Sequence, residues 1–187
     1  MKKFELTNEF VTNMFGTKLF RIRALVEFGD VEAGELGGYV EKESNLGHDD
    51  NAWVYDNAWV YGNARVYGDA LVYDNARVYG NAWVYGNAWV YGDAQVSGNA
   101  RVYGNGDYAY AHGFGSVNRT TTFFRLKDGG VGVQCGCFYG TLAQFRDKIR
   151  ETHGETKKAQ EYLMLADLME LRFEEDENEV GNRKYVE

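Results

Sequence analysis

The chain has 187 residues, a formal net charge of −8 at pH 7, no proline and two cysteines, and its hydrophobic fraction of 44% is sufficient for a buried core. The negative charge argues against direct binding to nucleic-acid phosphates, which requires a basic surface. Cys135 and Cys137 alone do not make a disulfide framework, and this cysteine usage is typical of a reducing compartment.

Export and membrane signals are missing from the sequence. Residues 1–9 lack the apolar run of a signal peptide, and no segment approaches the roughly 20 apolar residues of a membrane span. We therefore expect a cytoplasmic protein that does not enter a membrane.

Residues 1–50 precede a regular repeat and are predicted to form an N-terminal β cap. Apolar residues alternate at short spacing across Lys18–Phe28, which indicates a hairpin or strand pair. The turn at Gly34–Gly38 then leads toward the repeat, whose open end needs a terminal segment to close it. We interpret His48 as part of this cap rather than as a catalytic base.

From Asn51 to Gly104 a six-residue pattern, Asn/Asp-Ala-x-Val-Tyr-Gly/Asp, recurs with few deviations and without an insertion. Ala and Val are two residues apart, so in an extended segment both point to one side, while the Gly/Asp-Asn/Asp pair favours a sharp corner. One such strand cannot bury its apolar side alone, but stacked coils share a core. The pattern predicts a parallel β-helix over residues 51–116, with these buried positions: Ala52, Ala58, Ala64, Ala70, Ala76, Ala82, Ala88, Ala94, Ala100, Val54, Val60, Val66, Val72, Val78, Val84, Val90, Val96 and Val102.

The repeat resembles the hexapeptide-repeat proteins, in which an aliphatic residue and a small residue four positions later, here Val54 and Ala58, mark a triangular left-handed β-helix. It also resembles YdcK-like proteins, and that resemblance begins upstream at Phe28–Val40. The fold class implied is mainly β, a single-stranded, left-handed parallel β-helix with a small α+β module after it. This chain differs from the usual hexapeptide pattern because Tyr, not Gly, directly follows the aliphatic residue.

If three hexads make one coil, residues eighteen apart stack and the coils present three faces. The first face is apolar, and we expect the C-terminal region or a second copy to cover it. The second and third faces mix Trp, Tyr and Arg, a pattern typical either of rings that stack on one another or of a platform for bases or sugars. The first face comprises Trp53, Leu71, Trp89, Tyr55, Tyr73 and Tyr91; Trp59 and Arg77 lie on the second, and Arg65, Trp83 and Arg101 on the third.

Residues 117–173 are predicted to form a β-hairpin followed by two helices. Thr120–Leu126 and Val131–Cys135 flank a turn, and Thr141 with Gln144 makes a helix capping box. A second apolar helix is predicted over Lys157–Phe173. Thr120–Phe173 resembles a terminal module found on hexapeptide shafts of phage and prophage proteins, and residues 174–187 are predicted to be an acidic, flexible tail.

Catalytic and metal sites are poorly supported by the sequence. Hexapeptide acyltransferases use a His base and an acyl carrier such as coenzyme A, but residues 51–104 contain no His. Cys135-Gly-Cys137 with a distant His is a weak zinc pattern, and no cofactor motif occurs. We therefore predict no catalytic residue, metal or cofactor.

The function predicted is a non-catalytic β-helical scaffold that contacts a protein partner or another copy of itself. The phage resemblance implies a more specific form, an inhibitor that binds a host defence complex in the host cytoplasm. A hexapeptide-type acyltransferase and a binder of small ligands or nucleotides are the two alternatives.

Overall fold

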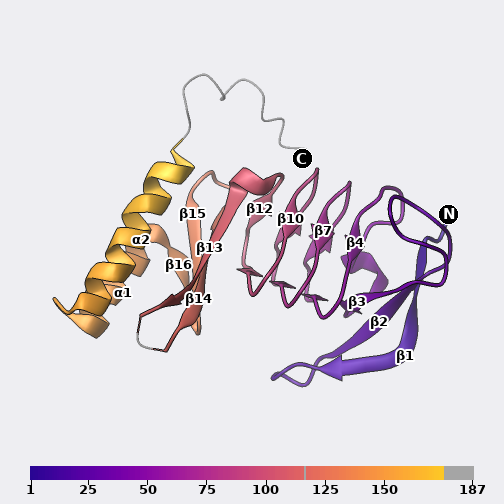
Figure 1. Ribbon diagram of the computed structural model, residues 1–187, viewed down its shortest axis with the longest axis horizontal. Helices are drawn as coiled ribbons and strands as arrows, with labels where there is room; N and C mark the ends of the chain where they lie inside the picture. Colours follow the sequence, from indigo (N-terminus) through magenta and orange to yellow (C-terminus); the bar gives the residue numbers. More distant parts are fainter. Residues whose placement is uncertain (116, 175–187) are drawn as a thin grey trace.

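The computed structural model describes residues 1–115 and 117–174. An N-terminal hairpin, a β-solenoid, an antiparallel sheet and two helices follow one another along an elongated molecule (Figure 1). The predicted mainly β class and the parallel solenoid with an α+β module are confirmed. Residues 175–187, which hold nearly all of the predicted acidic tail, lie outside the described residues.

The solenoid consists of two-residue strands that stack in three parallel sheets. Each strand pairs with the strand eighteen residues away, as in Trp53 with Leu71, so three hexads make one coil as predicted. The first face carries β4 (Trp53–Val54), β7 (Leu71–Val72) and β10 (Trp89–Val90); the second carries β5 (Trp59–Val60), β8 (Arg77–Val78) and β11 (Gln95–Val96); the third carries β6 (Arg65–Val66), β9 (Trp83–Val84) and β12 (Arg101–Val102).

The solenoid core is a narrow column of small aliphatic side chains. Every repeat Ala and Val from Ala52 to Val102 is fully buried, which confirms the predicted inward positions. The coils are joined by backbone hydrogen bonds such as Trp53 N–H to Ala70 O, at 3.1 Å. At the corners the sixth residue of most hexads has a positive φ, a conformation that favours glycine but is also adopted here by Asp56 and Asp74.

The N-terminal segment both caps the solenoid and extends it. Strands β1 (Phe4–Thr12) and β2 (Lys18–Ala24) form a hairpin, and β3 (Leu36–Val40) pairs antiparallel with β2 but parallel with β5. Residues predicted to belong only to the cap therefore already stack in register with the coils.

Lys3 and His48 fasten this cap to the first coil. The Lys3 ammonium is buried and donates hydrogen bonds to Asp50 O at 2.5 Å and Ala52 O at 2.8 Å. The His48 ring stacks on Phe4 with centroids 4.4 Å apart, and its Nδ1 accepts from Lys3 N–H at 3.2 Å. Both contacts support the predicted capping role of His48.

The C-terminal module is a four-stranded antiparallel sheet with both helices on it. The predicted hairpin and the two helices are present, and the Thr141–Gln144 capping box forms. The first strand of this sheet lies within the range predicted for the solenoid, so the coils end earlier than residue 116. The elements are β13 (Tyr108–Phe114), β14 (Arg119–Arg125), β15 (Val131–Cys135), β16 (Phe138–Thr141), α1 (Leu142–His153) and α2 (Lys157–Phe173).

The module closes the C-terminal end of the solenoid, where the last coil would otherwise expose unpaired backbone groups. Thr122 Oγ1 accepts from Gln95 N–H at 2.9 Å, and Lys127 N–H donates to Asn99 O at 3.1 Å. Within the part of the chain that the structure describes, no helix is both long and apolar enough to cross a membrane.

Candidate binding cleft

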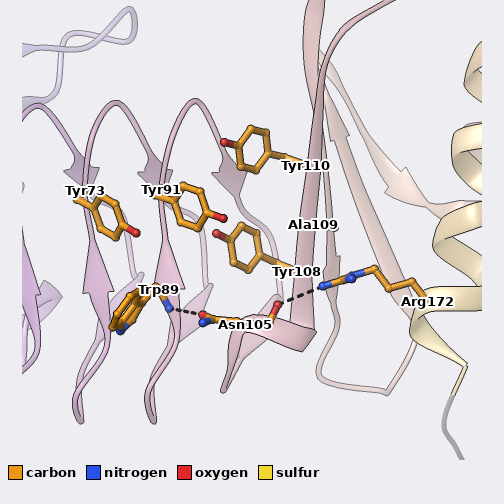
Figure 2. Close-up of a pocket in the computed structure, with 8 residues that line it drawn as sticks. All are labelled: Tyr73, Trp89, Tyr91, Asn105, Tyr108, Ala109, Tyr110 and Arg172. Carbon is orange, nitrogen blue, oxygen red and sulfur yellow. Dashed lines mark hydrogen bonds between the residues drawn. The ribbon is translucent and has the colours of Figure 1, made fainter.

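A cleft of about 490 Å³ lies where the first face of the solenoid meets the C-terminal module (Figure 2). Its walls come from the last coils, from the start of β13 and from the end of α2. We call it the aromatic cleft, and its lining residues are Tyr73, Trp89, Tyr91, Asn105, Tyr108, Ala109, Tyr110 and Arg172.

Four tyrosine rings hold one another in place along one wall. Tyr73 and Tyr91 occupy the same position in successive coils and stack with centroids 5.4 Å apart and an interplanar angle of 13°. Tyr108 and Tyr110 are two residues apart on β13, so both turn to one side, and their rings meet Tyr91 edge-on at 6.4 and 5.9 Å. The packed rings leave a rigid aromatic surface.

Gly92 allows this arrangement. A Cβ at this residue would lie 2.4 Å from the Tyr110 hydroxyl, so any larger residue would push the Tyr110 ring away from Tyr91. The repeat pattern assigns glycine here to the corner, but the close approach of Tyr110 gives it a second role.

On the other wall of the cleft, Asn105 links Trp89 of the solenoid to Arg172 of α2. It opens the 3₁₀ turn Asn105–Asp107, where the repeat ends, and its Oδ1 accepts from Trp89 N–H at 2.8 Å. Its backbone oxygen accepts from Arg172 Nη2 at 3.4 Å, which holds a guanidinium of α2 at the rim (Figure 2). Trp89 is 48% exposed and Tyr91 40% exposed, so both rings remain accessible.

The cleft is lined by neutral phenols and one guanidinium. Burial raises the pKa of Tyr73, Tyr108 and Tyr110 above the usual tyrosine value, so their phenols stay neutral near pH 7. The only charged side chain among the lining residues is Arg172. The cleft therefore offers ring faces, neutral hydroxyl groups and one cation.

Trp53 of the first face is buried, which differs from the sequence expectation. Trp53 is fully buried because Phe4 and Phe28 of the N-terminal segment pack against it edge-on, with centroids 6.2 and 5.3 Å away. Trp53 is thus unavailable to a partner, and the expected uninterrupted surface from Trp53 to Trp89 does not exist. Tyr55, Leu71 and Tyr73 are partly buried.

The expected cover of the first face is only partial. The C-terminal module lies mainly over the end of the solenoid, and from this module only Tyr108 and Tyr110 form ring contacts with Tyr91. Trp89 stays exposed beside them.

On the second and third faces the aromatic and basic residues stack on one another. The Arg77 guanidinium lies 4.5 Å from the centre of the Trp59 ring. Arg65 and Arg101 lie 5.7 and 4.3 Å from the Trp83 ring, and Arg65 and Trp83 line a smaller pocket of about 340 Å³. These rings are already in cation–π contact with guanidinium groups of the same faces, so the aromatic cleft is the stronger candidate site.

The remaining histidines and the two cysteines lie in the C-terminal module, where Cys135, Cys137 and His153 line a smaller pocket of about 240 Å³. His112 Nδ1 lies 2.9 Å from Thr120 Oγ1, and the His153 ring stacks on Tyr162 at 6.0 Å. Within the described residues no group of three His, Cys, Asp or Glu side chains is placed to hold a metal ion.

Sequence reasoning missed five of the eight residues that line the cleft, namely Asn105, Tyr108, Ala109, Tyr110 and Arg172. Tyr108 is six residues after Val102, at the position where a further repeat would place Val. A large aromatic residue at that position indicates that the chain leaves the coil. Asn105 and Arg172 carry no such signal, because 67 residues separate them.

The coils match a known repeat family. The family model described as the YdcK beta solenoid repeat matches residues 58–74, 64–78, 70–86, 76–92 and 94–106. The solenoid is thus built from YdcK-type repeats, as the sequence resemblance implied. No curated protein is significantly similar to the chain. The matched residues end before Tyr108 and Arg172, so the match covers coils of the solenoid and not the wall of the cleft that the C-terminal module provides.

Proposed function

We propose that this YdcK-type solenoid is a non-catalytic binding protein whose aromatic cleft receives a segment of a partner protein. The observation that carries the proposal is the exposure of Trp89 and Tyr91 in a cleft that the Arg172 side chain also lines. Tryptophan, tyrosine and arginine are the residues that most often dominate the binding energy of protein interfaces. Their combination in one recess supports a protein-binding role.

The rigidity of the cleft supports the same role. Tyr91 is fixed by ring contacts on both sides, and Trp89 stands on a coil whose backbone is hydrogen-bonded to its neighbours. Pre-ordered rings lose little side-chain entropy on binding. The volume of about 490 Å³ is sufficient for one or two large side chains of a partner segment.

The chemistry of the lining residues defines the segment that fits. An apolar or aromatic side chain would contact Trp89 and Tyr91, and a carboxylate next to it would pair with Arg172. The acyltransferase alternative gains no support, because no histidine lines the cleft.

The resemblance of Thr120–Phe173 to phage modules suggests one specific form of this function. In that form the protein is phage-encoded, acts in the host cytoplasm and inhibits a host defence complex by binding it. Phage infection of defence-positive cells, with and without expression of the protein, tests this form separately from the binding site.

A photo-crosslinking amino acid at Tyr91 tests the site. We expect it to cross-link one protein in cells, and we expect Arg172→Glu to abolish the product. The matched control places the same amino acid at Tyr61, which stacks on Tyr79 at 5.1 Å on another face. Equal cross-linking from Tyr61, or a product that survives Arg172→Glu, would overturn the proposal. Binding of purified partner to the wild type and to Trp89→Ala then measures the contribution of the ring, which we expect to exceed roughly tenfold in Kd.

A further inference from the structure

Strand β13 has a free edge. It is the outer strand of the C-terminal sheet, whose order is β13-β14-β15-β16, so β14 pairs with it on one side only. The register places Ala109 opposite Phe123 and Ala111 opposite Thr121. Among the described residues, no backbone hydrogen bond from another element reaches the opposite side of β13 between residues 109 and 113.

The hydrogen-bond pattern of the sheet shows which backbone groups point to this edge. In an antiparallel pair, the residues that exchange hydrogen bonds alternate along each strand. Leu126 N–H donates to Gly130 O at 2.8 Å, so the even-numbered residues of β14 bond to β15 and the odd-numbered ones to β13. The N–H and C=O groups of Ala109 therefore point to β14, and those of Tyr110 and His112 point outward.

The aromatic cleft passes along this edge. The Tyr110 side chain packs with the solenoid core, whereas Ala109 packs with the core beneath the helices. Residues on opposite faces of a strand line one recess only where that recess passes the edge between the faces. Arg172 reaches the same recess from α2 (Figure 2). The outward groups of Tyr110 thus border the cleft, and His112 continues the edge beyond it.

The sequence of β13 leaves this edge unprotected. Exposed edges are usually blunted by charged side chains, by proline or by very short strands. β13 has seven residues, Tyr-Ala-Tyr-Ala-His-Gly-Phe, without a carboxylate, an ammonium or a guanidinium group, and its pairing with β14 becomes irregular only after Ala111. The outer strand β1 instead carries Glu5 and Glu9, in ion pairs with Arg23 and Arg21. A strand added to β13 would meet no charge on the edge itself.

We propose that β13 binds an extended segment of the partner protein as a fifth strand of the C-terminal sheet. This binding mode rests on the proposed function of the cleft, and it defines the conformation that the partner segment adopts there. Tyr110 and His112 offer their outward N–H donors and C=O acceptors to the backbone of the segment. Alternate side chains of the added strand point to opposite faces, so an apolar one meets Trp89 and Tyr91 while a neighbouring carboxylate meets Arg172.

The walls of the cleft favour a single segment over a second copy. The edge at Tyr110 lies between the last coils and the end of α2, in a recess of about 490 Å³. A slender extended segment fits between these walls. The β13 edge of a second copy is recessed in the same way, so the coils and helices of the two copies keep their edges apart.

Two proline variants test the orientation of the edge. Proline is tolerated on an edge strand where its missing N–H faces solvent, but it removes a ladder hydrogen bond where that N–H points to a neighbouring strand. His112→Pro should therefore shift the thermal midpoint by less than about 2 °C, whereas Ala111→Pro should lower it by roughly 5 to 10 °C. Equal losses in the two variants would overturn the proposal, because His112 N–H would then not face outward.

Peptides with methylated backbones test the added strand. The probe is a nine-residue peptide with a central Tyr-Glu pair, selected from a display library for binding to the full-length protein. In an added strand, alternate amides point to β13 and the others point away. Two matched derivatives carry N-methyl groups, one on the odd-numbered amides and the other on the even-numbered amides. Fluorescence anisotropy should show one derivative binding like the parent peptide and the other at least about tenfold more weakly.

Amide hydrogen exchange locates the bound peptide. The parent peptide should protect the Tyr110 and His112 amides, and both His112→Pro and Trp89→Ala should weaken its binding. Failure to select a peptide, equal binding of the two methylated derivatives, or full binding to His112→Pro would overturn the added strand. If Trp89→Ala still abolished binding in the last two cases, the cleft would stand as a partner site without strand addition. Protection of the same amides by high protein concentration alone would place a second copy at the edge and would also overturn the proposal.

Discussion

Gly68→Ala would test how the corners of the solenoid are made. Gly68 has φ +71°, and an added Cβ would lie 3.0 Å from Gly86 N and 3.2 Å from Gly86 O in the next coil. A non-glycine residue in the left-handed region costs about 1 to 2 kcal/mol. The close approach forces the two corners apart by a few tenths of an ångström, and so we expect a total destabilisation of about 2 kcal/mol.

Gly68→Asp should be milder, although it adds the same Cβ. Asp74 occupies the equivalent corner position of another hexad with φ +60°, and its carboxylate accepts from Gly92 N–H, eighteen residues later, at 2.9 Å. The carboxylate introduced by Gly68→Asp would face Gly86 N–H in the same way. The added hydrogen bond should recover about 1 kcal/mol relative to Gly68→Ala.

Urea denaturation followed by tyrosine and tryptophan fluorescence measures these differences. Gly104→Ala is the matched control, because Gly104 follows in the same corner column with an extended φ of −152° and open space around its Cβ position. Its free energy of unfolding should change by less than about 0.5 kcal/mol. Equal stability of Gly68→Ala and Gly104→Ala, or equal loss in Gly68→Ala and Gly68→Asp, would refute this account of the corners.

Two further predictions concern the contacts between the N-terminal cap and the first coil. Trp53→Ala should lower the free energy of unfolding by about 3 to 5 kcal/mol, whereas Trp89→Ala should cost less than about 1 kcal/mol, since Trp53 is fully buried and Trp89 is 48% exposed; thermal unfolding compares the two. Burial lowers the pKa of His48 below 6.5, so the unfolded state takes up a proton first and stability should fall as the pH drops below 6.5. His48→Gln should flatten this part of the stability curve measured by urea titration, and a curve identical to that of the wild type would contradict the assignment.

The repeat period made most of the solenoid predictable. Ala52 and Val54 fix which side of each strand is buried, and the six-residue spacing gives the stacking of residues eighteen apart. The hairpin and helices followed from turn and capping residues that act locally, such as Thr141. These features depend on contacts within one or two elements.

Exposure along the first face was not predictable, because it depends on what the ends of the chain cover. Trp53 and Trp89 occupy the same repeat phase, yet one is fully buried and the other half exposed. The difference comes from Phe4 and Phe28, which precede the repeat and have no periodic relation to it. Arg172 of α2 also lies outside the repeat, so the repeat period could not predict its position in the cleft.

The position of the cleft follows from the geometry of a repeat. Coils of equal length stack directly on one another, so their faces are flat ladders in which each ring or guanidinium contacts the next. A recess arises where this regularity ends and a chain segment leaves the coil. Here that happens at Asn105–Asp107, after which β13 turns Tyr108 and Tyr110 back toward the last coils. The same closure that removes the exposed end of the solenoid thus creates a concave aromatic surface with exposed rings, and these features support our proposal of a binding role there.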